Sequence, residues 1–397
     1  MLKKVALLFL FLIISLTSTS QVSECKCSLL KYSEENSEKV IALGELIENA
    51  FNESNTKPFV ENFNKEAFNK NITKDSLIDS NDMYTRRFLK SLENTSNTLG
   101  ERILSEIEDG AYYNFINFEF NIPESAYYMT FRIYSEETGV NYHDYKICYD
   151  GENVMYNDIY IYLTGEHLSE TFGRIYKASK PSKNKFVKLF KGEKKHPFSK
   201  VIKAQQLLKE GKPKEAYETI TEVKGKNAEE KFFLILKGNI AAAYDDNLYK
   251  ENLEIFAKLY PDDPTLYMKQ IDYYILIGNY IRAIENIDKL MFETDDDFLN
   301  IMKANLYLNQ TDYKNADIHY SYMIENYPFL VEGYIGHISS LTYQERYSDA
   351  VNVINTLTKQ GFDKNELSDF LESDDEQGIN VLEALVLSDE YKAWKKS

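Results

Sequence analysis

The stretch Gly278-Asn279-Tyr280-Ile281-Arg282-Ala283 decides the fold of the second half of this 397-residue chain. It has a turn residue, an aromatic residue two positions on, and a small residue three positions further. Glycine tolerates the left-handed backbone of a short turn, and a small residue lets two helices approach closely. Thr311–Ala316 and Glu345–Ala350 repeat it, Gly211–Ala216 is an earlier copy with Pro213 at the aromatic position, and Asn247–Asn252 is a degraded copy. Their last residues are 36, 31, 33 and 34 positions apart, so the sequence predicts about five helical hairpins.

This spacing resembles the tetratricopeptide repeat, whose unit has about 34 residues. The resemblance runs from about Phe198 to Phe362 and implies hairpins that stack into an all-α superhelix. We expect residues 363–397 to form capping helices that cover the last apolar face. In this family a small residue packs at the helix crossings. The matching residues here are Ala204, Ala216, Ala283, Ala304, Ala316 and Ala350.

The family's first helices line a groove that holds an extended peptide or a partner helix. The positions that match this groove are Lys237, Ala241, Tyr244, Met268, Asp272, Ile275, Ile301, Asn305, Asn309, Ile335, Ser339 and Tyr343. Chaperone-binding members clamp a peptide carboxylate with Lys and Asn. Here Ala241 follows Lys237, and the next unit offers Met268 and Asp272. This departure argues against a co-chaperone role in the cytosol.

The N-terminal half, residues 36–179, has a different pattern. Helical spacing over 38–52, 57–69 and 83–106 gives way to a period of two over 112–121, 127–134, 141–149 and 153–164. In the first strand, Asn114, Ile116, Phe118 and Phe120 alternate with their neighbours. In the last strand, Tyr156, Asp158, Tyr160 and Tyr162 do so. We therefore predict an α+β domain with a four-stranded antiparallel sheet, followed by a helix over 168–178. The order of elements resembles a nuclear transport factor 2-like cone fold, and a generic α+β layer is the alternative.

The N-terminus predicts export. Lys3 and Lys4 precede an apolar stretch, Val5–Leu16, that is interrupted only by Ser15, and small residues lead to a cleavage site after Ser20. Residues 21–35 are then a flexible mature N-terminus, and the lysine-rich residues 180–197 are a linker. A lipid anchor at Cys25 is disfavoured because Glu24 stands where such signals need a small residue. No later stretch is long and apolar enough to span a bilayer.

The three cysteines, Cys25, Cys27 and Cys148, all lie beyond the predicted cleavage site. In an oxidising compartment either Cys25 or Cys27 would pair with Cys148. The alternative is a buried Cys148 beside a loose Cys-x-Cys tail. The pair alone is a poor zinc site, so we expect no metal.

No catalytic motif stands out in the sequence. The most suggestive patch is Tyr142-His143-Asp144, with Asp158 on the neighbouring strand. An Asp or His beside Tyr suits acid–base chemistry in a pocket. A tyrosine-rich sheet face packed on helices explains the same residues, so we expect neither an enzyme nor a cofactor. The acidic run Asp295-Asp296-Asp297 lacks calcium-loop spacing and is expected at a helix start.

The net charge of −17 argues against a nucleic-acid partner. Together these features predict an exported scaffold of the periplasm or cell surface that binds a protein or peptide. Two alternatives remain open. One is small-ligand binding or acid–base catalysis in the α+β domain. The other is a structural part of a cell-envelope assembly.

Overall fold

The computed structural model describes residues 25–74, 82–135, 139–179, 197–261, 263–374 and 379–397. The predicted signal peptide and nearly all of the basic linker lie outside these ranges. Five helices, five strands and a sixth helix form the N-terminal half: α1 Glu34–Asn52, α2 Lys57–Glu61, α3 Lys65–Thr73, α4 Met83–Ser91, α5 Thr95–Glu108, β1 Tyr112–Asn121, β2 Ala126–Ser135, β3 Gly139–Tyr149, β4 Val154–Ile161, β5 Glu166–His167 and α6 Leu168–Ser179. This confirms the predicted order of helices followed by an antiparallel sheet.

Two of the predicted N-terminal helices are each split in two. The side chain of Asn64 accepts a hydrogen bond from the backbone N–H of Ala67 and starts α3 as a separate helix. Just before it, Phe63 bridges to Tyr156 of β4. The predicted helix over 83–106 likewise breaks between Ser91 and Thr95. The sheet also has a fifth strand, β5, which the sequence pattern did not predict.

The sheet is an antiparallel meander in the order β1-β2-β3-β4-β5. Because of two bulges, the residues that share a face of the sheet differ from the predicted ones in β1 and β4. An irregularity at Ile116 of β1 places Phe118 on the same face as Tyr113 and Phe115. A second irregularity skips Asn157 of β4, so Tyr156 does not share a face with Asp158. Simple alternation fails at both points because a bulge inserts one extra residue.

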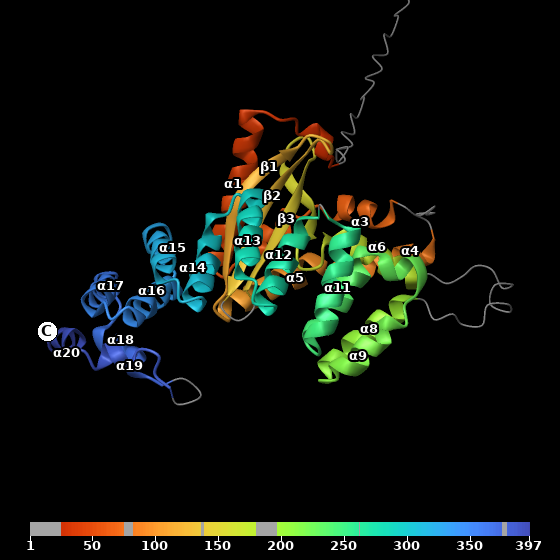
Figure 1. Cartoon of the computed structure of the whole chain (residues 1–397). Coiled ribbons are helices and arrows are strands. Elements are labelled where there is room, and N and C mark those ends of the chain that lie inside the picture. Colours follow the sequence, from red (N-terminus) through yellow and green to blue (C-terminus); the bar gives the residue numbers. More distant parts are fainter. Residues whose placement is uncertain (1–24, 75–81, 136–138, 180–196, 262, 375–378) are drawn as a thin grey trace, which may run out of the picture.

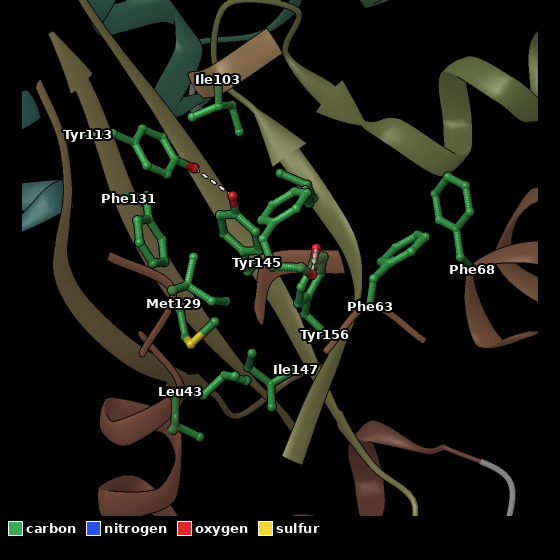
Figure 2. Packing of buried hydrophobic residues seen from close by; sticks show 14 of the residues in the cluster. Leu43, Phe63, Phe68, Ile103, Tyr113, Met129, Phe131, Tyr145, Ile147 and Tyr156 are labelled. Atoms are coloured by element: carbon green, nitrogen blue, oxygen red, sulfur yellow. Dashed lines mark hydrogen bonds between the residues drawn. The ribbon is translucent and has the colours of Figure 1, made fainter. Parts of the chain in front are cut away.

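Both faces of the sheet are covered (Figure 1). The inner face packs against α1, α2 and α5 in an aromatic core that includes Tyr113, Phe131, Tyr145 and Tyr156. Figure 2 shows the hydroxyls of Tyr113 and Tyr145 meeting inside this core, 2.5 Å apart. The outer face turns toward the C-terminal helices.

In its described residues, the C-terminal half has five helical hairpins and three closing helices. The hairpins pair α8 Pro197–Lys209 with α9 Pro213–Thr221, α10 Lys231–Ala242 with α11 Asp246–Leu259, α12 Pro264–Leu276 with α13 Tyr280–Thr294, α14 Asn300–Asn309 with α15 Tyr313–Asn326, and α16 Val331–Tyr343 with α17 Tyr347–Lys359. The closing helices are α18 Lys364–Glu372, α19 Glu383–Val386 and α20 Asp389–Lys396. No helix among the described residues is long and apolar enough to cross a membrane.

The hairpins repeat more regularly than the sequence pattern predicts. Four second helices place Ala216, Ala283, Ala316 or Ala350 four residues after the N-cap. In α11 that position is Tyr249, not Asn252. The corrected intervals are 33, 34, 33 and 34 residues. The error arose because α10 has 12 residues where α8, α12 and α16 have 13. The turn before α11 also has no left-handed residue, whereas Gly211, Gly278, Thr311 and Glu345 all have φ between 59° and 71°.

The six predicted packing alanines are all fully buried. The closing helices cover the last hairpin, since Tyr391 and Trp394 pack with Ile354 and Leu357 of α17. Only four residues of the apolar stretch 381–387 are helical, in α19. The end of the stack is therefore closed by α18 and α20 together with this short turn.

Candidate functional site

Three acidic residues lie at the starts of successive units, 33 positions apart. Glu230 and Asp263 are the N-caps of α10 and α12, and Asp296 is the N-cap of the 3-10 turn Asp297–Leu299 that leads into α14. Each carboxylate holds one cation: Arg174, Lys231 and Arg132, respectively. Because Arg132 and Arg174 come from the α+β domain, the repeated position joins the two halves of the chain.

The joint at Arg132 is the most deeply buried of the three. Its Nη1 donates to Asp296 at 2.6 Å, and its guanidinium lies 3.6 Å from the centre of the Phe298 ring. Asp296 also accepts a hydrogen bond from the Tyr142 hydroxyl at 2.7 Å. Burial raises the pKa of the Asp296 carboxyl, while the adjacent Arg132 opposes that rise. All these groups bind one another, so this cluster fixes the two halves together rather than presenting reactive groups.

The other two joints repeat the same arrangement with weaker burial. Arg174 of α6 pairs with Glu166 and lies 3.5 Å from Glu230, while its guanidinium stacks 4.3 Å above Phe232. Lys231 bonds to Asp263 at 2.7 Å and to the Tyr160 hydroxyl at 3.0 Å. The sheet and α6 therefore pack against the starts of α10, α12 and α14.

This docking leaves most of the predicted groove positions in contact with solvent. Asp272, Asn305 and Asn309 are exposed, and Tyr244 and Tyr343 are 38% and 51% exposed. Ala241 and Ile301 are buried, and Met268 packs in the apolar cluster that also contains Tyr142 and Tyr160 of the sheet. Lys237 lies 5.4 Å from the centre of the Tyr217 ring in the preceding unit.

The second unit's groove positions need a correction of two residues. Gly238 takes the small position of α10, because a Cβ there would meet Tyr249 and Asn252 at about 4 Å. The position equivalent to Asp272, Asn305 and Ser339 is then Asn239, rather than Lys237 or Ala241. We call these four residues the first-helix row.

Internal donors orient three members of the first-helix row. Lys269 donates to the side-chain oxygen of Asn239 at 2.9 Å, and Tyr249 donates to Asp272 at 3.3 Å. Tyr320 donates to the oxygen of Asn305 at 2.6 Å. The amide nitrogens of Asn239 and Asn305 are left to face other partners. One polar side chain per unit is suited to binding along a chain and not to catalysis.

The four residues of the predicted acid–base pocket do not converge. His143 points into the inner core and accepts or donates a hydrogen bond with Tyr113 at 3.1 Å, while Tyr142 lies on the outer face. Burial lowers the pKa of His143 to about 4 and raises that of Asp144 to about 7. Asp158 is bound by Ser169 and Asn71 at the edge beside α3 and α6. They behave as packed polar groups of the sheet.

A cavity does lie in another part of the molecule, where α3 and α6 meet the start of α10. This junction pocket has a volume of about 510 Å³ and a mixed lining that includes Lys74, Ser169, Lys177, Asn227 and Phe233. Its volume is within the range of small-ligand sites. None of the four predicted pocket residues lines it.

Cys25 forms a disulfide with Cys148, and Cys27 remains a free thiol. The bridge spans 123 residues and ties the segment before α1 to the end of β3. Burial raises the pKa of the Cys27 thiol, which disfavours the reactive thiolate.

Sequence reasoning missed Arg132, Arg174 and their carboxylate partners. A usable signal existed, because acidic residues recur at 230, 263 and 296 with the period of the repeat. The run Asp295-Asp296-Asp297 does lie at a helix start, but its central residue also binds a cation from the sheet. The long-range partner could not be read from the local pattern.

No group of three or more metal-binding side chains occurs within the described ranges. Comparison with known proteins adds no relative: no family model matches the chain, and no curated protein matches it.

Proposed function

We propose that this chain is an exported scaffold of the tetratricopeptide type, which binds an extended segment of a partner protein along its first helices. The observation that supports this most strongly is the first-helix row. It has one member in each of the last four units, and its two asparagines have orienting partners inside the protein. The α+β domain packs at the helix starts, so it does not occupy Asn305, Asn309 or Tyr343, which remain exposed.

The mode of binding follows from the chemistry of these residues. Asn305 and Asn309 carry amides that can pair with the main chain of an extended peptide. Tyr343 stacks on Tyr313 at 5.8 Å and leaves an aromatic surface beside them. Aromatic and amide side chains together give contact area at low entropic cost.

The test is affinity capture from the envelope fraction of the source cell. The triple variant Asn305→Ala, Asn309→Ala and Tyr343→Ala should lose the captured partner. The matched control changes Lys314, Ile318 and Ser321 to Ala, three exposed positions on the second helix of the unit that contains Asn305 and Asn309. Retention of the same partner by the first variant, or its equal loss by both, would reject this binding surface.

A second candidate is a small ligand in the junction pocket, favoured by its volume of about 510 Å³. Lys74 is exposed at its rim and is not a member of the joints described above. Small anions that raise the melting temperature of the wild type but not of Lys74→Glu would support this candidate. Equal shifts in both proteins would place the binding elsewhere.

A further inference from the structure

The strand β1 forms one edge of the sheet. It pairs with β2 through nine of its ten residues, and among the described residues no other strand lies beyond it. In the described part of the chain, no backbone hydrogen bond joins its residues 113–121 to any segment except β2. The outward-facing N–H and C=O groups of residues 113–121 are therefore open to another extended chain.

The composition of β1 does nothing to prevent such pairing. Its sequence, Tyr-Tyr-Asn-Phe-Ile-Asn-Phe-Glu-Phe-Asn, has five aromatic residues and one charged residue. Natural edge strands usually carry lysine or proline, or are very short, which blocks addition of a further strand. Here neither residue type occurs, and the strand is long. Its bulge at Ile116 interrupts the edge at one point and leaves strand residues on both sides of it. The edge thus has the features of a docking strand.

A cavity of about 300 Å³ opens at the bulge in this strand. Asn114, Phe115 and Ile116 line it from β1, and Glu48 lines it from α1. On the opposite side Asp295 and Asp297 line it from the loop before α14, together with Tyr327 and Phe329. The middle of the β1 edge therefore lies in a slot between α1 and the repeat units.

The slot carries a negative charge. Four carboxylates, those of Glu48 and the Asp295–Asp297 run, face one guanidinium, that of Arg132. Arg132 is already bound to Asp296, and Asp297 accepts hydrogen bonds from the hydroxyls of Tyr322 and Tyr327. Phe329 is 50% exposed at the same place. Carboxylates beside aromatic rings favour a lysine or arginine side chain.

We propose that the free edge of β1 accepts an extended segment of a partner protein as a sixth strand. A Lys or Arg side chain of that segment occupies the acidic slot at Ile116. The main chain supplies the affinity through ladder hydrogen bonds, and the basic residue sets the register. This surface is separate from the first-helix row, so one scaffold holds two partner segments, or two parts of one partner.

The experiment uses a displayed library of random peptides of about nine residues, long enough to pair with the strand. Enriched peptides are synthesised, and hydrogen exchange of β1 is measured with and without each. We expect enriched peptides to carry a basic residue, to slow exchange across β1, and to lose affinity when that residue becomes Glu. The variant Ile116→Lys fills the slot with its own cation and should weaken binding about tenfold or more.

The matched control is Ile122→Lys, which makes the same change in the turn after β1, where Ile122 is 78% exposed. It should leave the affinity unchanged. The proposal is overturned if no peptide slows exchange in β1, or if Ile116→Lys binds as well as the wild type. Peptides that protect only the first helices would support the scaffold function and reject this strand site. A dimer that Ile116→Lys dissociates would identify a second copy as the occupant and reject the basic partner.

Discussion

The guanidinium of Arg132 lies 2.6 Å from the carboxylate of Asp296, although the two residues are 164 positions apart in the chain. Arg132 is on the outer face of β2, and Asp296 begins the fourth helical unit. Both side chains are buried, so neither charge is solvated by water. This buried pair fixes where the α+β domain packs on the repeats.

Replacing Asp296 with Asn should destabilise the protein by about 3 kcal/mol or more, because Arg132 would keep a buried charge without its partner. Urea denaturation measures this change. Glu285→Gln, which removes an exposed pair with Arg282, should change the stability by about 0.5 kcal/mol or less. Similar effects of the two variants would show that the joint does not hold the halves together.

Replacing Cys25 with Ser should lower the stability by about 2–5 kcal/mol, because the disulfide closes a long loop. Cys27→Ser keeps the bridge to Cys148 and should have a much smaller effect. Melting temperatures under non-reducing conditions compare the two variants. If Cys27→Ser were the more damaging change, Cys27 would be the natural partner of Cys148.

Gly336→Ala should destabilise the repeats by about 1–3 kcal/mol. Alanine is normally preferred over glycine inside a helix, by about 1 kcal/mol. Here the added Cβ would overlap the ring of Tyr320 on the preceding helix. Thermal unfolding shows whether the variant is less stable or more stable than the wild type. Combining the change with Tyr320→Leu should recover part of the loss, whereas a stabilised single variant would contradict the close packing of α15 and α16.

The stability should depend on the protonation of His143 between about pH 6.5 and 4. Its pKa in the folded state is lowered to about 4 by burial, so the unfolded chain takes up a proton first as the pH falls. Wild type should therefore lose up to roughly 3 kcal/mol relative to His143→Gln over this range. Asp144, with a pKa raised to about 7, acts in the opposite direction in both proteins. Denaturation at several pH values checks the difference, and parallel curves would refute it.

Periodicity predicted the class and order of the elements well. Repeated turn residues such as Gly278 and buried alanines such as Ala283 are local signals, and each requires only its own hairpin. The predicted register of the second unit was wrong because the turn before α11 lacks a left-handed residue. A large Tyr249 also replaces the usual alanine, and its ring lies beside Gly238 on the facing helix.

The bulges and the joints could not be predicted in the same way. Ile116 is the extra residue of β1, and Asn157 is that of β4. Their positions depend on how each strand pairs with its neighbour, and the local sequence pattern does not contain this information. The partners of Arg132 and Arg174 depend on how two halves pack. The groove positions Asn305, Asn309 and Tyr343 were predicted from family spacing, and the structure leaves them exposed. Their binding role stays a prediction.

The most direct test of the proposed scaffold function is site-specific photo-crosslinking in the source cell. A benzophenone amino acid replaces Asn305 on a first helix in one protein, and Ile318 on the second helix of the same unit in another; both positions are exposed. The account predicts a discrete crosslinked partner from position 305 and none from position 318. No adduct at position 305, or the same adducts from both positions, would contradict it.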